Sequence, residues 1–338
     1  MNEGLLGHPA AKAAGLAGAL LLLAAAAVCS VLVGNGNVAV RDVVDAYSGF
    51  DGSNVQRAVR YVRVPRTLVA IEAGAALGVA GALAQGLTRN PLAGPDILGV
   101  TAGASLAAVL AIATLGITTL SGYVWFAFLG AALGGGLVYL LASTGPTGAT
   151  PVKLALAGVG VSAMLGAITS AFTFLDLDTL RQYRFWVVGS LNGTSQGVVA
   201  PLLPFVLVGI ALSAGLARGL NVLALGDELA VALGRRLAWT RGTGAAAVVL
   251  LAGSATAAAG PIGFVGLTVP HAARAITGPD HRWLLPYAAV LSATLLVVAD
   301  TVGRVVARPQ EIQVGIVTAL VGAPVFILLV RRQRLSGL

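Results

Sequence analysis

The stretch 67-TLVAIEAGAALGVAGALAQGLTRNPLAGPDILGVTAGAS-105 determines the fold class of this chain. Its first half is an apolar run whose one charged residue is Glu72, and a turn rich in Pro and Gly separates this run from a second one that starts at Ile97. A helix that crosses the hydrocarbon core of a bilayer needs about 20 mostly apolar residues. The stretch therefore predicts two membrane helices joined by a short polar turn.

The rest of the chain repeats this pattern. Of its 338 residues 57% are hydrophobic and 10% are charged, whereas a soluble globular protein has about 25% charged residues. We predict an all-α, polytopic membrane protein with about ten transmembrane helices, and a single transmembrane domain over 1–338, because everything outside the apolar runs is short. The runs are 15–33, 67–87, 97–117, 123–142, 152–173, 198–216, 244–260, 262–277, 283–303 and 312–330.

Glycine is abundant, with 45 residues, and small residues let helices approach closely within a lipid bilayer. Two segments, 93-AGPDILGVTAG-103 and 259-AGPIGFVGLTVP-270, resemble each other and are separated by five predicted spans. They would lie on opposite sides of the membrane, as an inverted repeat requires. A chance echo in a chain rich in Ala and Gly is the alternative, and the sequence leaves both open.

The formal net charge of +8 is interpreted here by its distribution over the loops, and not as a sign of nucleic-acid binding. If the N-terminus is cytoplasmic, the larger share of Lys and Arg falls on cytoplasmic segments, so we predict that both termini are cytoplasmic. The first run is expected to be a retained helix and not a cleaved signal peptide. Cys29 is the one cysteine, which excludes an intramolecular disulfide. The segments left outside still carry many arginines: Arg41, Arg57, Arg60, Arg63, Arg66, Arg181, Arg184, Arg304 and Arg308.

Several motifs occur in a fixed order along the chain: 63-RVPR-66, the stretch quoted first, 260-GPIGFVGLTVPHAARAITGPDHRWLLP-286, 299-ADTVGR-304 and 311-EIQVGIVTALVGAPVFILLVRR-332. Together they resemble the permeases of bacterial iron-siderophore, haem and cobalamin ABC importers, known as FecCD-type or BtuC-like permeases. The resemblance covers nearly the whole chain. It implies the fold of a type II ABC importer permease in the cytoplasmic membrane.

The same resemblance implies a function. The chain would be the permease subunit that translocates a metal chelate, with a ferric siderophore as the first expectation and haem or cobalamin as the alternative. Its partners would be a second permease subunit in a homodimer or paralogous heterodimer, two cytoplasmic ATPase subunits, an extracytoplasmic substrate-binding protein and membrane lipid. The chain has no phosphate-binding loop of the G-x-x-x-x-G-K-[ST] type, so ATP and Mg would be bound by the ATPase and the chain itself would be neither an enzyme nor a cofactor protein.

The segment 225-LGDELAVALGRRL-237 is a polar island between apolar runs. Leu225, Leu229, Leu233 and Leu237 recur every fourth residue, which predicts a short amphipathic helix at the membrane surface. The resemblance assigns the loop 219–242 to ATPase coupling, and an ordinary interfacial anchor is the alternative. The residues that match the family's coupling motif are Gly226, Asp227, Glu228, Ala230, Leu233 and Gly234.

Two further sets of residues follow from the resemblance. Arg63, Arg66 and Arg304 match arginines that pair with acidic residues of the binding protein; alternatively, the first two anchor a span at the headgroups and Arg304 neutralises Asp300. The fifth span, 152–174, has a face of small residues and is expected to line the pathway at the dimer interface. The residues expected to face the cargo there are Val161, Met164, Leu165 and Thr169.

The remaining polar residues give weaker indications. His271 is expected to have a structural role at a helix end, since no second ligand lies three or four residues away, and His281 is expected in a solvated loop. Asn90 and Pro91 are expected to shape the backbone. Glu72 is either a pathway carboxylate or the partner of an arginine such as Arg66 or Arg304, and we favour the pairing.

Two other classes of protein are disfavoured. An ion-driven secondary transporter needs paired ionisable residues near mid-membrane, and the spans offer little beyond Glu72 and Asp300. A membrane enzyme needs clustered His and carboxylates at ligand spacing, which the sequence lacks.

Overall fold

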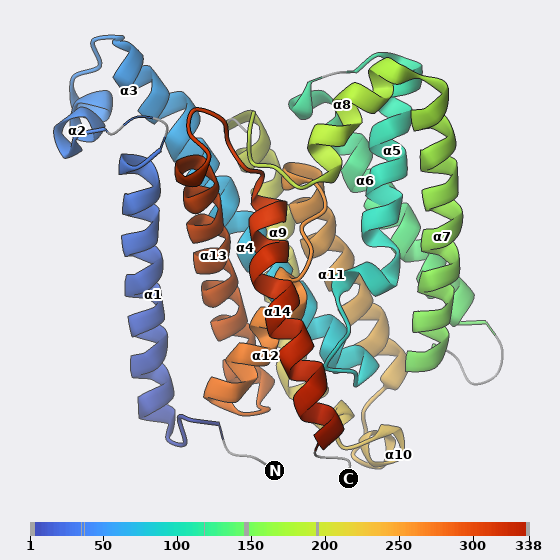
Figure 1. Cartoon of the computed structure of the whole chain (residues 1–338). Coiled ribbons are helices and arrows are strands. Elements are labelled where there is room, and N and C mark those ends of the chain that lie inside the picture. Colours follow the sequence, from blue (N-terminus) through green and yellow to red (C-terminus); the bar gives the residue numbers. More distant parts are fainter. Residues whose placement is uncertain are drawn as a thin grey trace.

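The computed structural model of the chain describes residues 4–34, 36, 38–117, 119–144, 149–193 and 196–335. Within these residues every regular element is helical, which confirms the all-α class (Figure 1). The elements are α1 (Pro9–Leu32), α2 (Val40–Ser48), α3 (Asn54–Ala58), η1 (Val59–Arg63), α4 (Val64–Thr88), η2 (Pro95–Leu98), α5 (Val100–Leu115), α6 (Leu120–Ala142), α7 (Pro151–Leu175), α8 (Leu177–Val187), α9 (Gln196–Leu223), α10 (Asp227–Ala232), α11 (Leu237–Ala259), α12 (Val265–Thr277), α13 (His281–Val306) and α14 (Val314–Leu335).

All ten predicted apolar runs contain a helix. In the described part of the chain seven helices are long and apolar enough to cross a membrane, namely α1, the Asn54–Thr88 stretch that includes α4, α6, α7, α9, α11 and α13. The 16 residues of α5 and the 13 of α12 span only about 24 and 20 Å at 1.5 Å per residue, less than a hydrocarbon core of about 30 Å. Neither helix crosses the full core, and we call these two short helices half-spans.

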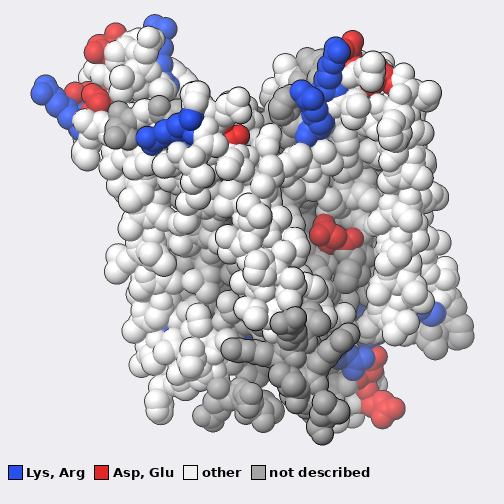
Figure 2. Space-filling view, in the orientation of Figure 1, with Lys and Arg blue, Asp and Glu red and all other residues white. Residues whose placement is uncertain are grey.

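The two ends of the bundle differ. Figure 1 shows α2, α3 and α8 at the upper end, whereas α10 lies at the lower end, where α1 begins and α14 finishes. The stretch before the second span folds into α2, α3 and η1, which carry the chain from α1 into α4. Figure 2 shows that charged groups gather mainly at the two ends, and that the surface between them is largely uncharged.

Helix α4 lies at the centre and contacts α9, α11, α12 and α13. Close approach at glycine makes these contacts possible: a Cβ atom at Gly81 would lie 1.8 Å from the carbonyl oxygen of Gly266, and one at Gly103 would lie 2.1 Å from that of Gly130. No side chain fits at such distances, so these glycines hold the backbones of neighbouring helices together.

The chain interrupts its helices twice, between α4 and α5 and between α11 and α12 (Figure 1). Pro95 of the first break lies against Gly266 at the start of α12, because a Cβ atom at Gly266 would be 3.1 Å from Cδ of Pro95 and 2.9 Å from the carbonyl oxygen of Leu77. Leu77 lies half-way along α4, so the two breaks meet at mid-depth of the bundle. Helix α5 then runs to the upper end and α12 to the lower end, the geometry that an inverted repeat requires.

Candidate functional site

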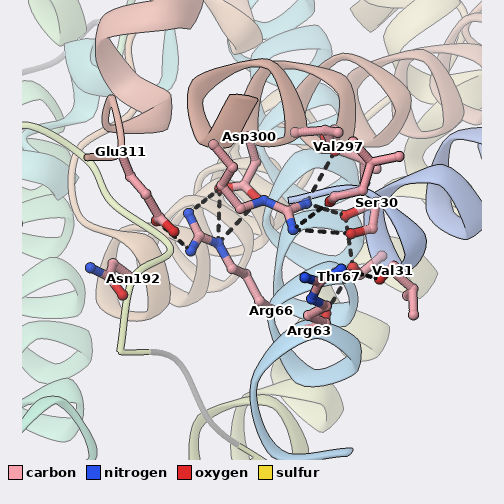
Figure 3. A network of polar contacts seen from close by, with 12 residues as sticks. Ser30, Val31, Arg63, Arg66, Thr67, Asn192, Val297, Asp300 and Glu311 are labelled. Carbon is pink, nitrogen blue, oxygen red and sulfur yellow. Dashed lines mark hydrogen bonds and ion pairs between the residues drawn. The ribbon is translucent and has the colours of Figure 1, made fainter. Parts of the chain in front are cut away.

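At the upper end, Arg66 joins three segments through its guanidinium group (Figure 3). Its Nη2 donates to Asp300 Oδ1 at 2.8 Å, and its Nε lies 3.1 Å from both Asp300 oxygens. Its Nη1 donates to Glu311 Oε2 at 2.7 Å. Arg66 and Asp300 are 6% and 2% exposed. The bidentate pair ties α4 to α13 and to the segment before α14.

Arg304 lies on the other side of the same carboxylate. Its Nε is 3.1 Å from Asp300 Oδ2, the contact considered above as the alternative to a docking role for Arg304. Its Nη2 donates to Ser30 Oγ at 2.7 Å and its Nη1 to the carbonyl oxygen of Ser30 at 3.0 Å. Arg304 therefore adds α1 to the elements held at this end.

Arg63 is the most accessible of the three predicted docking arginines, because it is half-buried whereas Arg66 and Arg304 are buried. Its Nη1 donates to the carbonyl oxygens of Val31 and Leu32 at 2.9 and 3.1 Å. Docking of a binding protein at these arginines remains a prediction. Other arginines of the upper end are exposed and carry no motif that singles them out: Arg41, Arg57, Arg181 and Arg308.

The favoured pairing of Glu72 is wrong. The nearby acids that engage Arg66 and Arg304 are Asp300 and Glu311, and within the described structure Glu72 Oε1 is buried without a hydrogen-bond partner. Glu72 lies on α4, inside the membrane-spanning stretch, and the arginines proposed for it are taken by Asp300, an acid already considered for Arg304, and by Glu311, which no motif linked to Arg66.

The expectation of a solvated His281 is also wrong. Asp280 caps α13, so His281 occupies its first turn and packs against α9, 5% exposed, with Nδ1 2.8 Å from Asn221 Oδ1. His271 is half-buried within α12. Among the residues that the structure describes, no group of three or more His, Cys, Asp and Glu side chains is placed to hold a metal ion.

The polar island at the lower end is not one helix. It consists of the six-residue α10, a turn, and the start of α11, because Gly234 adopts φ 76° and stops the first helix. Gly226, with φ 110°, starts α10 in a conformation that side chains disfavour. The loop is attached to the bundle by Asp227, whose two oxygens accept bonds from Arg241 at 2.9 and 2.8 Å and whose Oδ1 lies 3.3 Å from Arg89.

The predicted coupling residues divide into two groups. Asp227 and Ala230 face the bundle, and Ala230 is 1% exposed. Glu228, Leu233 and Gly234 are exposed, together with Leu229. Leu229 and Leu233 thus form an exposed apolar surface at the lower end, while Asp227 holds the loop against the bundle.

Helix α7 places the predicted pathway residues on two faces. Val161 and Thr169 are buried against the bundle, Leu165 is half-buried, and Met164 is 50% exposed. The exposed side of this helix carries large apolar residues such as Leu156 and Val159, and between them Gly160 and Gly166 are open, since nothing lies within 4 Å of a Cβ atom at either glycine. The four residues therefore do not form one continuous lining within a single chain.

A carboxylate that the sequence did not single out lies at mid-depth. Asp96, in η2, lines a cavity of about 300 Å³ together with Thr101, Ser162 and the segment 261–263. Its position in 93-AGPDILG-99, directly before the half-span α5, is the one sign of it in the sequence.

A family model, that of the FecCD transport family, matches residues 21–332. The chain belongs to the FecCD transport family. FecCD proteins are transport permeases, which are not a family of enzymes. The resemblance stated from the ordered motifs is thereby confirmed.

Individual relatives agree with this assignment. The ferric enterobactin transport system permease protein FepD of Escherichia coli (strain K12) is 44% identical over 326 residues, 96% of this chain and 97% of FepD. The cobalamin import system permease protein BtuC of Halobacterium salinarum is 42% identical over 278 residues, 82% of this chain and 74% of BtuC. A metal-chelate type ABC transporter solved in an inward-facing conformation superposes with a TM-score of 0.82 at 31% identity, covering 94% of this chain and 98% of that one.

Proposed function

We propose that this FecCD chain is the permease subunit of an ATP-binding-cassette importer that carries a ferric siderophore across the cytoplasmic membrane. The similarity to FepD over almost the full length of both chains carries this proposal. Haem or cobalamin is the second candidate, and the 42% identity to the cobalamin permease BtuC of Halobacterium salinarum supports cobalamin.

In this proposal two cytoplasmic ATPase subunits bind ATP and Mg and dock on the surface formed by α10 and the turn after it. Leu229 and Leu233, 54% and 58% exposed, supply an apolar contact, and Glu228 lies beside them. The bonds of Asp227 to Arg241 transmit force from this surface to α11, because a rigid attachment is needed for a docked subunit to move a helix.

The second permease subunit, an identical or paralogous chain, packs on the face that carries α7 and α14. Helix α14 borders an apolar groove of about 610 Å³, lined in part by Ile316, Ala319 and Ile327. The exposed small residues of α7 offer a second close contact in lipid. The pathway then runs between the two subunits and is lined from one side by Met164.

The lower end is the cytoplasmic end in this proposal, with both termini there, and the upper end receives the substrate-binding protein. Arg235 and Arg236 are exposed beside α10, in agreement with positive charge on the cytoplasmic side. On the upper end, Arg63 is the first contact for acidic residues of the binding protein, and Arg66 and Arg304 lie behind it.

Growth and uptake test this proposal. A strain that lacks the chain should lose uptake of a radio-iron siderophore and should regain it when the chain is supplied together with its co-encoded ATPase and binding protein. Haem and cobalamin are the matched alternative cargoes in the same strain. Restored uptake of haem or cobalamin without that of any ferric siderophore would assign the chain to the second candidate.

A further inference from the structure

The meeting point of the two broken helices carries a charged group. Asp96 belongs to η2, whose Pro95 lies against the first turn of α12 beside the midpoint of α4. The segment on the opposite side of this point contains Phe264 in the left-handed conformation, φ 67°, which is uncommon for a bulky residue and indicates a constrained turn. In transporters, discontinuous helices of the two halves commonly build the substrate site near the midplane.

Asp96 is an exposed residue and lines the cavity of about 300 Å³. The Thr101 hydroxyl donates to its Oδ1, and Ser162 of α7 adds a second hydroxyl to the lining. Pro261 and Gly263 supply backbone from the other break. Three elements from distant parts of the sequence thus converge on one small cavity with a carboxylate in its wall.

No cation in the described part of the chain forms an ion pair with Asp96. Figure 2 shows an acidic patch in a hollow at mid-height, away from the charged groups at the two ends. A carboxylate at this depth is costly unless it is hydrated or meets a cation, and such residues mark the path of a transported molecule.

We propose that Asp96 selects the charge of the cargo as it passes the mid-depth cavity, by binding an ammonium, N–H or O–H group on the metal chelate. This inference rests on the proposed function. A single carboxylate attracts a cationic or hydrogen-bond-donating chelate and repels an anionic one, so the preferred cargo is a hydroxamate-type ferric chelate of neutral or positive charge. Thr101 fixes the carboxylate and Ser162 offers a further polar contact.

The test compares chelates that differ in one charge. Wild type and the isosteric variant Asp96→Asn are assembled with the ATPase and binding protein, and uptake is measured for a ferric trihydroxamate with a terminal ammonium and for its N-acetylated form. For each chelate, the uptake rate of the variant is divided by that of wild type. Because both importers use the same binding protein, the preference of that protein cancels in this ratio. Asp45→Asn, which removes a surface carboxylate of α2, is the control.

We expect Asp96→Asn to lower uptake of the ammonium chelate about tenfold, the loss typical of a hydrogen bond to a charged group, and to change that of the acetylated chelate little. Asp96→Glu should keep the preference of wild type. Equal effects of Asp96→Asn on both chelates, or no effect on either, would overturn the role of Asp96 while leaving the proposed function intact. A wild-type importer that accumulates no ferric chelate would contradict the proposed function itself, and this inference with it.

Discussion

Arg66 and Asp300, 234 residues apart in the sequence, form a buried bidentate ion pair in which Nη2 and Oδ1 are 2.8 Å apart. The same carboxylate contacts Arg304 at 3.1 Å, so this one acid contacts two buried guanidinium groups, and Glu311 is the second acid, which pairs with Arg66. Removing one partner of a buried pair leaves an uncompensated charge, which costs far more than the pair itself contributes.

Asp300→Asn should therefore destabilise the chain by about 3–5 kcal/mol, the cost of breaking a buried ion pair. Thermal unfolding of the detergent-solubilised protein measures the effect. Asp45→Asn is the control, since it breaks the exposed pair with Arg41, whose side chain is 89% exposed, and exposed pairs contribute little. Equal melting temperatures for the two variants would show that the Asp300 network does not support the upper end.

Arg63 and Arg66 should respond differently to charge reversal. Arg63→Glu should weaken docking of the binding protein, more at low than at high ionic strength, because exposed charge pairs are screened by salt. Arg66→Glu should instead reduce the amount of folded protein, since it places a third acid beside Asp300 and Glu311. Docking is measured on immobilised permease with Arg41→Glu as the control. If Arg63→Glu weakens docking no more than Arg41→Glu does, and by the same amount at low and high ionic strength, then Arg63 does not belong to the docking surface.

The exposed surface of α10 gives a third prediction. Leu229→Asp should lower ATP-driven uptake by at least about tenfold, as expected for a central apolar contact, while leaving the protein in the membrane. Leu5→Asp is the control, because Leu5 is 83% exposed and precedes α1, which begins at the same end. Co-purification of the ATPase with each variant locates the defect. Unchanged uptake by Leu229→Asp would show that this loop does not couple the ATPase to transport and would favour the alternative of a membrane anchor.

The two faces of α7 predict a pattern of crosslinks. In a Cys29→Ser background, Met164→Cys should crosslink to the second permease subunit or be protected by cargo, because its side chain is 50% exposed. Val161→Cys, at a position that is 4% exposed, should do neither. The readout is the dimer band after oxidation, with and without the chelate. If neither position crosslinks nor is protected, α7 does not face the partner or the pathway.

The helices could be predicted well from the sequence because a bilayer allows few kinds of backbone structure. All ten apolar runs are helical, since a chain in lipid must satisfy its backbone within each segment. The start of α12 was harder to predict than that of α5, because the break before α12, 259-AGPIGF-264, is apolar, whereas the break before α5 contains the polar residues Arg89, Asn90 and Asp96. The proximity of Pro95 to Gly266 shows that the two breaks meet, which neither segment reveals alone.

The sites were predicted less completely. The motifs located the arginines, but the partners of Arg66 lie 234 and 245 positions away, and no local pattern joins such residues. For the same reason Glu72 was paired wrongly and the burial of His281 was missed. Asp96 was treated as part of a turn that shapes the backbone. Its role depends on Ser162 and the segment 261–263, which are distant in the sequence and lie beside it only in the folded chain.

Reconstitution tests the central claim most directly. Proteoliposomes that contain the chain with its co-encoded ATPase, with the binding protein and a radio-iron siderophore outside and ATP trapped inside, report transport as iron retained in the lumen. The proposed function predicts accumulation that requires ATP, the ATPase and the binding protein together, and that persists when ion gradients are dissipated. Accumulation that proceeds without ATP and stops when the ion gradient is dissipated would contradict it and would identify an ion-driven transporter instead.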